Sequence, residues 1–85
     1  MPNYQLQIVT QQEVVFTGEV TALTLPGEEG YFGVLANHAP IIGVIGSGKA
    51  QMRVGKDEKS FEVSGGFFEM KDNKATLLVD TLSGF

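Results

Sequence analysis

The sequence predicts an all-β fold, a flattened β-sandwich or barrel of about eight to ten short strands. Apolar residues recur with a period of two along most of the 85 residues, which is the pattern of strands with one buried face. No window shows the 3.6-residue period of an amphipathic helix. The chain has 11 glycines, about twice the average share of ~7%, and this indicates many turns.

Eight segments alternate between apolar and polar residues, or are apolar throughout, and predict the strands in order. They are residues 4–8, 13–18, 21–25, 41–45, 49–54, 60–64, 67–71 and 74–80. Residue types that favour turns separate several of them, at positions 26–27, 55–58, 65–66 and 72–73. Residues 41–45 (IIGVI) are apolar at nearly every position, which predicts a strand covered on both faces. Many short strands at regular spacing are typical of a sandwich or barrel.

Length and composition restrict the class of protein. Eighty-five residues fit one domain, which we place at residues 1–85. A net charge of −4 with six scattered basic residues argues against nucleic-acid binding. The absence of cysteine excludes a disulfide framework and a thiolate metal site. No apolar run approaches the ~20 residues of a membrane-spanning helix, and the N-terminus lacks a signal-peptide pattern. We expect a cytosolic chain, or one bound to something cytosolic.

Residues 27–40 interrupt the alternation and predict a long loop, the kind of segment that often carries function. This loop and the residues after it contain more large apolar side chains than a soluble monomer usually exposes. They are Tyr31, Phe32, Val34, Leu35, Ile41 and Ile42. Some can fold inward, and others can form a protein-binding patch, since aromatics flanked by polar residues are typical interface anchors. We expect a mixture, with Tyr31 and Phe32 exposed at the loop tip.

The segment at residues 43–50 (GVIGSGKA) is similar to a phosphate-binding Walker A loop, but it lacks two features of that motif that bind magnesium and phosphate. Ala50 stands where a hydroxyl would hold magnesium. The residues after it alternate as a strand, whereas the motif needs a helix N-terminus. We interpret the segment as a glycine-rich turn between two strands, and we predict no cofactor.

Candidate catalytic residues are few. His38 is the only histidine, so a zinc site would need carboxylates alone to complete it. No nucleophile motif accompanies His38, and we expect its ring to order the turn at Ala39 and Pro40 by hydrogen bonds. Glu28 and Glu29 are adjacent, whereas acid–base pairs are opposed and differently buried. The two glutamates are better explained as a solvated rim or as a contact for a basic partner. We therefore predict a protein that is not an enzyme.

Four segments of the chain have a distinctive sequence. The longest is residues 27–40 (GEEGYFGVLANHAP), and the others are residues 16–18 (FTG), 64–69 (SGGFFE) and 76–81 (TLLVDT). Together they resemble the epsilon subunit of the F-type ATP synthase, specifically its N-terminal β-sandwich domain. They follow the order and spacing of the family between Tyr4 and Thr81, which is nearly the whole chain.

The resemblance implies a rotor subunit that links the gamma subunit to the c-ring and couples proton flow to ATP synthesis without catalysing it. It implies a peripheral position on the cytoplasmic side of the bacterial inner membrane, with no direct insertion. The implied c-ring contact consists of Glu28, Glu29, Gly30, Tyr31 and Phe32. The implied gamma contact consists of Thr10, His38, Ala39, Pro40 and Ile42.

The chain departs from the resembled family at two places. Tyr31 follows Gly30 where many members carry a polar or acidic residue, so a charge toward the c-ring would come from Glu28 or Glu29. The family usually continues into a C-terminal helical hairpin with an inhibitory movement and, in some members, an ATP site. This chain stops at Phe85, and we expect it to couple rotation without acting as a brake.

Two other classes of protein remain as alternatives to the rotor subunit. One is a free-standing β-sandwich that binds a small ligand or sugar, which would need a concave pocket lined by aromatic residues. The other is a small hydrolase that uses His38, which the missing nucleophile motif disfavours.

Overall fold

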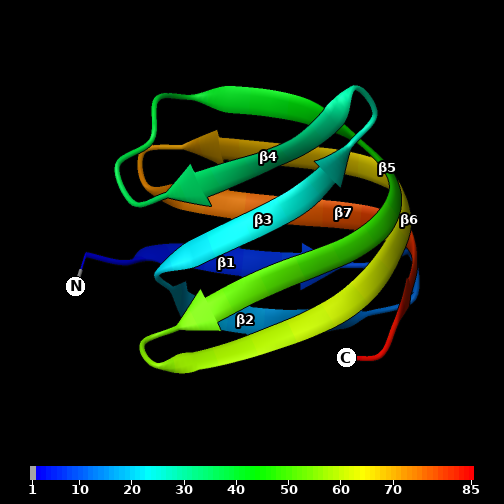
Figure 1. Ribbon diagram of the computed structural model, residues 1–85, viewed down its shortest axis with the longest axis horizontal. Coiled ribbons are helices and arrows are strands. Elements are labelled where there is room, and N and C mark those ends of the chain that lie inside the picture. The colour runs from blue at the N-terminus through cyan, green and yellow to red at the C-terminus, as the bar shows by residue number, and fades with distance from the viewer. Residues whose placement is uncertain (1) are drawn as a thin grey trace.

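The computed structural model describes residues 2–85, and its seven strands form one hydrogen-bonded sheet (Figure 1). The strands are β1 (Tyr4–Val9), β2 (Val14–Val20), β3 (Ala22–Gly27), β4 (Gly30–Leu35), β5 (Ile41–Val54), β6 (Asp57–Lys71) and β7 (Lys74–Ser83). No helix occurs among the residues described. The all-β class predicted from the sequence is confirmed.

Two long strands fold this single sheet into a sandwich. The strand order is β2-β1-β7-β6-β5-β3-β4, and every neighbouring pair is antiparallel except β1 and β7. β5 and β6 pair along their whole length and curve from one layer into the other (Figure 1). One layer contains β2, β1 and β7 with residues 41–45 and 66–71. The other contains β3 and β4 with residues 50–54 and 57–62.

Glycines allow β6 to bend while it stays paired with both neighbours. Gly65 and Gly66 have φ angles of 70° and 132°, which residues with a side chain rarely adopt. A Cβ atom on Gly66 would lie 1.9 Å from the carbonyl oxygen of Leu78 in β7. The curved strand therefore comes too close to its neighbour for any side chain at this position.

The number of strands is smaller than the eight to ten expected, because two of the expected breaks are wrong. Residues 46–48 and 65–66 bend β5 and β6 without ending them, and Ser47 still pairs with Ser64 across the bend. The glycine-rich segment before Ala50 is thus part of a strand and not a turn between two strands. The expected turns at residues 55–58 and 72–73 are present, since Val54 pairs with Asp57 and Lys71 pairs with Lys74.

Residues 27–40 do not form the long loop that we expected. β4 occupies residues 30–35 of that segment, and it pairs with β3 from Gly27–Gly30 to Ala22–Leu35. Its inward-facing side chains, Phe32 and Val34, do follow a period of two. Gly33 hides that period in the sequence, because it has no side chain that would mark the outward-facing position between them.

Alternate residues of both layers point inward and form one core. The buried apolar residues are Tyr4, Leu6, Ile8, Val20, Leu23, Leu25, Val34, Ile45, Ala50, Met52, Phe61, Val63, Phe68, Met70, Ala75, Leu77 and Val79. Tyr4 is the polar member of this set, and its phenol donates a hydrogen bond to the carbonyl oxygen of Val34 (2.8 Å). This bond links β1 to β4 across the two layers. Burial raises the pKa of the Tyr4 phenol, since a charged form would lose its hydration.

Candidate protein-binding surfaces

Glu28 and Glu29 form the two-residue turn of the β3–β4 hairpin. Gly27 pairs with Gly30, and Gly30 has a φ angle of 134° that glycine adopts without strain. The amide of Glu28 donates a hydrogen bond to the carbonyl oxygen of Val44 in β5 (2.9 Å). The turn is therefore fixed against β5, and both glutamates are exposed at one end of the sandwich (Figure 1).

Tyr31 follows this turn on β4, and 60% of its surface is exposed. Its hydroxyl oxygen accepts a hydrogen bond from the amide of Lys49 (3.1 Å), in the stretch of β5 where the pairing with β3 shifts register. A Cβ atom on Gly48 would lie 2.7 Å from the same hydroxyl oxygen. Tyr31 is thus exposed, as expected from the sequence, and these contacts also fix the direction of its side chain.

Phe32 differs from the expectation, because it is half-buried and packs against the core. Its ring lies 6.0 Å from the ring of Phe68, centroid to centroid, at an angle of 58°. The reason is its position on β4, where the side chain alternates with Tyr31 and points inward. The five residues of the expected c-ring contact are therefore adjacent in the structure, but Phe32 supports the hairpin from inside.

His38, Ala39 and Pro40 lie in the β4–β5 loop, residues 36–40, and all three are exposed. The amide of His38 donates to the carbonyl oxygen of Leu35 (3.3 Å). Its ring Nδ1 lies 2.7 Å from the carbonyl oxygen of Ala39, which can only accept, so Nδ1 donates. The imidazole therefore orders its own turn, as the sequence predicted.

Thr10 lies in the β1–β2 turn and stabilises it. Its hydroxyl oxygen is 3.3 Å from the amides of Gln12 and Glu13, which donate to it, and its own amide donates to the carbonyl oxygen of Glu13 (2.9 Å). This turn and the loop that carries His38 lie at opposite ends of the sandwich (Figure 1). The structure therefore does not bring together all the residues of the expected gamma contact.

An exposed apolar row crosses the outer face of the layer between these two ends. Val44, Phe67, Leu78 and Val9 pair laterally on the neighbouring strands β5, β6, β7 and β1. The first three are 46%, 57% and 42% exposed, and Val9 is half-buried. Ile42, two residues before Val44 on the same face, is 74% exposed. We call these five residues the apolar row. A contiguous apolar surface of this kind is typical of an interaction site.

The apolar row corrects the expectation that residues 41–45 are covered on both faces. Ile45 is buried and Ile41 is half-buried, whereas Ile42 and Val44 are exposed. The described residues form no third layer over this face. Val44, Phe67 and Leu78 were not among the expected contact residues, because only the strand register shows that they are neighbours.

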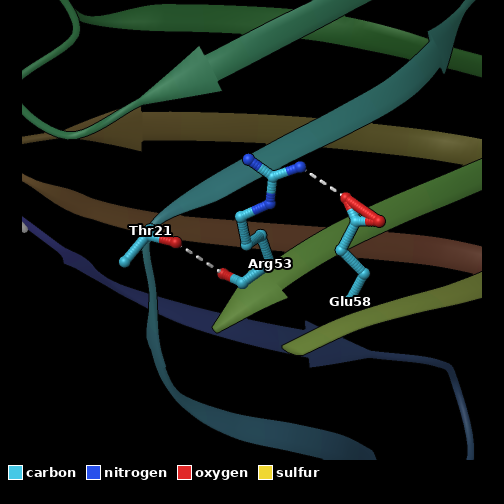
Figure 2. Close-up of polar contacts among 3 residues, drawn as sticks. All are labelled: Thr21, Arg53 and Glu58. Atoms are coloured by element: carbon cyan, nitrogen blue, oxygen red, sulfur yellow. Dashed lines mark hydrogen bonds and ion pairs between the residues drawn. The ribbon is translucent and has the colours of Figure 1, made fainter. Parts of the chain in front are cut away.

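The outer face of the other layer is polar near the β5–β6 hairpin. Figure 2 shows Arg53 of β5 in an ion pair with Glu58 of β6, and the hydroxyl of Thr21 donating to the carbonyl oxygen of Arg53 (3.1 Å). An exposed ion pair of this kind contributes at most about 1 kcal/mol. The exposed apolar residue Leu35 pairs with Ala22 on this layer. This outer face is therefore polar near the hairpin, whereas the outer face of the layer that contains β1 and β7 carries the apolar row.

Three further observations concern metal ions, membrane-spanning helices and grooves. Within residues 2–85 no three His, Asp or Glu side chains gather so that they could hold a metal ion. No helix in the same range has the length and hydropathy needed to cross a membrane. A groove of about 570 Å³ between the β1–β2 turn and the C-terminal residues has Phe85 as its aromatic side chain. Sugar-binding and drug-like pockets are usually richer in aromatic residues.

The sequence matches a family described as "ATP synthase, Delta/Epsilon chain, beta-sandwich domain" over residues 3–83. The chain belongs to this family. It is 43% identical over 81 residues to the ATP synthase epsilon chain of Chlorobium limicola, covering 94% of this chain and 92% of that one. It is 40% identical over 75 residues to the epsilon chain of Leptospira borgpetersenii, covering 88% of this chain but only 59% of that one.

Solved structures support the same fold for this family member. A chain of the mitochondrial ATP synthase of Euglena gracilis, from a cryo-EM structure of its OSCP/F1/c-ring assembly, superposes with a TM-score of 0.91 at 23% identity. The match covers 98% of this chain and 54% of the Euglena chain. A chain from the central stalk and c-ring of the Tetrahymena thermophila enzyme gives a TM-score of 0.78 at 16% identity. The predicted resemblance to the epsilon family is confirmed.

Proposed function

We propose that this chain is a non-catalytic part of the rotor of a proton-driven ATP synthase, where it links the gamma subunit to the c-ring. The observation that carries the proposal is the apolar row, which is exposed on a member of a family of ATP synthase subunits. A soluble domain gains free energy when a partner covers such a surface, about 25 cal/mol for each Å² of apolar area. The row is therefore the kind of surface that a partner protein covers and stays bound to in an assembly.

We assign the gamma contact to the apolar row together with Thr10, His38, Ala39 and Pro40. Ile42 and Val44 continue directly from the loop that contains His38, and Val9 precedes Thr10 in the chain. The row thus connects two segments that lie at opposite ends of the sandwich. A partner that covers the whole layer would contact both ends, which explains how Thr10 and His38 can belong to one interface.

We assign the c-ring contact to the β3–β4 hairpin. Glu28 and Glu29 provide two exposed carboxylates, and Tyr31 provides an exposed ring that the Lys49 amide holds in place. A fixed aromatic residue loses little conformational entropy on binding, and adjacent carboxylates favour a partner with basic or hydrogen-bond-donating loops. In the bacterial enzyme this hairpin would face the cytoplasmic side of the inner membrane without entering it.

Gel filtration tests the two contacts separately. The purified chain is mixed with the gamma subunit of the same organism, with its detergent-solubilised c-ring, or with both, and each mixture is compared with the components alone. We expect the chain to co-elute with gamma and, when gamma is present, with the c-ring. Elution of the chain at its own volume in every mixture would contradict the proposed function.

A further inference from the structure

One side chain, that of Asn73 in the β6–β7 turn, connects three segments of the chain. Its Oδ1 accepts a hydrogen bond from the amide of Asn37 (2.7 Å), and its Nδ2 donates to the carbonyl oxygen of Asn3 (2.9 Å). The Asn73 carbonyl oxygen also accepts from the amide of Gln5 (3.3 Å). Figure 1 shows the β4–β5 loop, the β6–β7 turn and the start of β1 at the same end of the sandwich.

The β4–β5 loop depends on Asn73 for its attachment. The other hydrogen bonds of residues 36–40 are local, from the His38 amide to Leu35 and from the His38 ring to Ala39. Within residues 2–85, the bond from the Asn37 amide to Asn73 Oδ1 is the one that ties this loop to a distant segment. Asn37 also has a φ angle of 64°, a left-handed conformation that residues with a side chain adopt at some cost.

We propose that Asn73 is a positioning residue for the gamma contact, because its side-chain Oδ1 fixes the loop of His38, Ala39 and Pro40 in the conformation that meets the partner. The inference rests on the proposed function. A loop that is ordered before binding loses less conformational entropy when the partner arrives. Asn73 itself lies outside the assigned contact, so it affects the affinity for gamma only by holding the β4–β5 loop in place.

The geometry of Asn73 allows its two hydrogen bonds to be separated by substitution. Asn73→Asp keeps an oxygen that can accept from the Asn37 amide, but it cannot donate to Asn3. Asn73→Gly removes both bonds and still tolerates the φ angle of 61° at this position. Asp72→Gly is the matched control, because Asp72 precedes Asn73 in the same turn with a φ angle of 53°. Within residues 2–85, the Asp72 carboxylate accepts no hydrogen bond, in contrast to the side chain of Asn73.

Two measurements are made on the full chain and each variant: amide hydrogen exchange at Asn37, and the Kd for the purified gamma subunit. Asn73→Gly should speed exchange at Asn37 and weaken gamma binding by about two- to tenfold, the range of one ordinary hydrogen bond. Asn73→Asp should restore both readings toward those of the unmodified chain. Asp72→Gly should change neither.

The outcomes separate the inference from the proposed function. If the unmodified chain binds gamma but Asn73→Gly binds equally well, the positioning role is wrong and the proposed function remains. If Asn73→Gly and Asp72→Gly weaken gamma binding equally, the inference is also overturned, because a general effect of changing the β6–β7 turn would then explain both losses. If the unmodified chain does not bind gamma, both proposals are wrong.

Discussion

Replacing Gly66 with alanine is expected to destabilise the domain by about 4 kcal/mol or more, which is among the largest effects that single substitutions produce. The added Cβ would lie 1.9 Å from the carbonyl oxygen of Leu78 and 2.8 Å from the Cα atom of Val79. Both obstacles are backbone atoms of the paired strand β7, so no side-chain rotation can relieve them. Chemical denaturation followed by circular dichroism measures the loss.

Gly30→Ala is the control for Gly66→Ala. Gly30 has nearly the same φ angle, 134° against 132°, but a Cβ there would meet no atom within 4 Å. Its cost should therefore be limited to backbone strain, about 1–3 kcal/mol. If both variants lose the same stability, strain at positive φ explains the requirement for glycine, and the close approach of β6 to β7 does not.

Ile42→Asp is expected to weaken binding of the gamma subunit by about 2–4 kcal/mol, which corresponds to a Kd about 30- to 900-fold higher. Ile42 is 74% exposed, so the isolated domain should lose no more than about 1 kcal/mol of stability. The large effect arises only in the complex, where an unpaired carboxylate would be buried against an apolar partner. Isothermal titration calorimetry gives the affinity, and thermal unfolding gives the stability.

Leu35→Asp makes the same chemical change on the other layer. Leu35 is 62% exposed on β4, away from the apolar row, and its substitution should leave the affinity for gamma within about twofold of the original, as expected for a surface change outside the interface. Normal gamma binding by Ile42→Asp, or an equal loss in both variants, would show that the apolar row is not the gamma contact.

The fold class could be predicted from the sequence because it depends on local patterns. The period of two marked most strand segments, and the turn at Asp72 and Asn73 was recognised from residue types that tolerate positive φ. The continuity of β5 and β6 could not be predicted in this way. Gly65 and Gly66 look like a break in the sequence, whereas their actual role is to let β6 pass close to Leu78, a contact between segments far apart in the chain.

The candidate surfaces were predictable to a smaller extent. The hairpin residues Glu28 and Tyr31 stood out because they lie in one segment. The apolar row joins Val44, Phe67 and Leu78, whose adjacency follows from the register of three strands. An apolar residue in an alternating segment looks the same whether it faces the core or the solvent, so sequence alone could not separate Phe67 from Phe68.

The central claim, that this chain couples proton flow to ATP synthesis, is tested most directly by reconstitution. F-type ATP synthase in membranes of the same organism is stripped of its own epsilon subunit, and the 85-residue chain is added back before an imposed proton gradient drives ATP synthesis. We predict that the unmodified chain restores synthesis and that Ile42→Asp does not at the same concentration. Synthesis that stays at the stripped level with the unmodified chain bound would contradict the account.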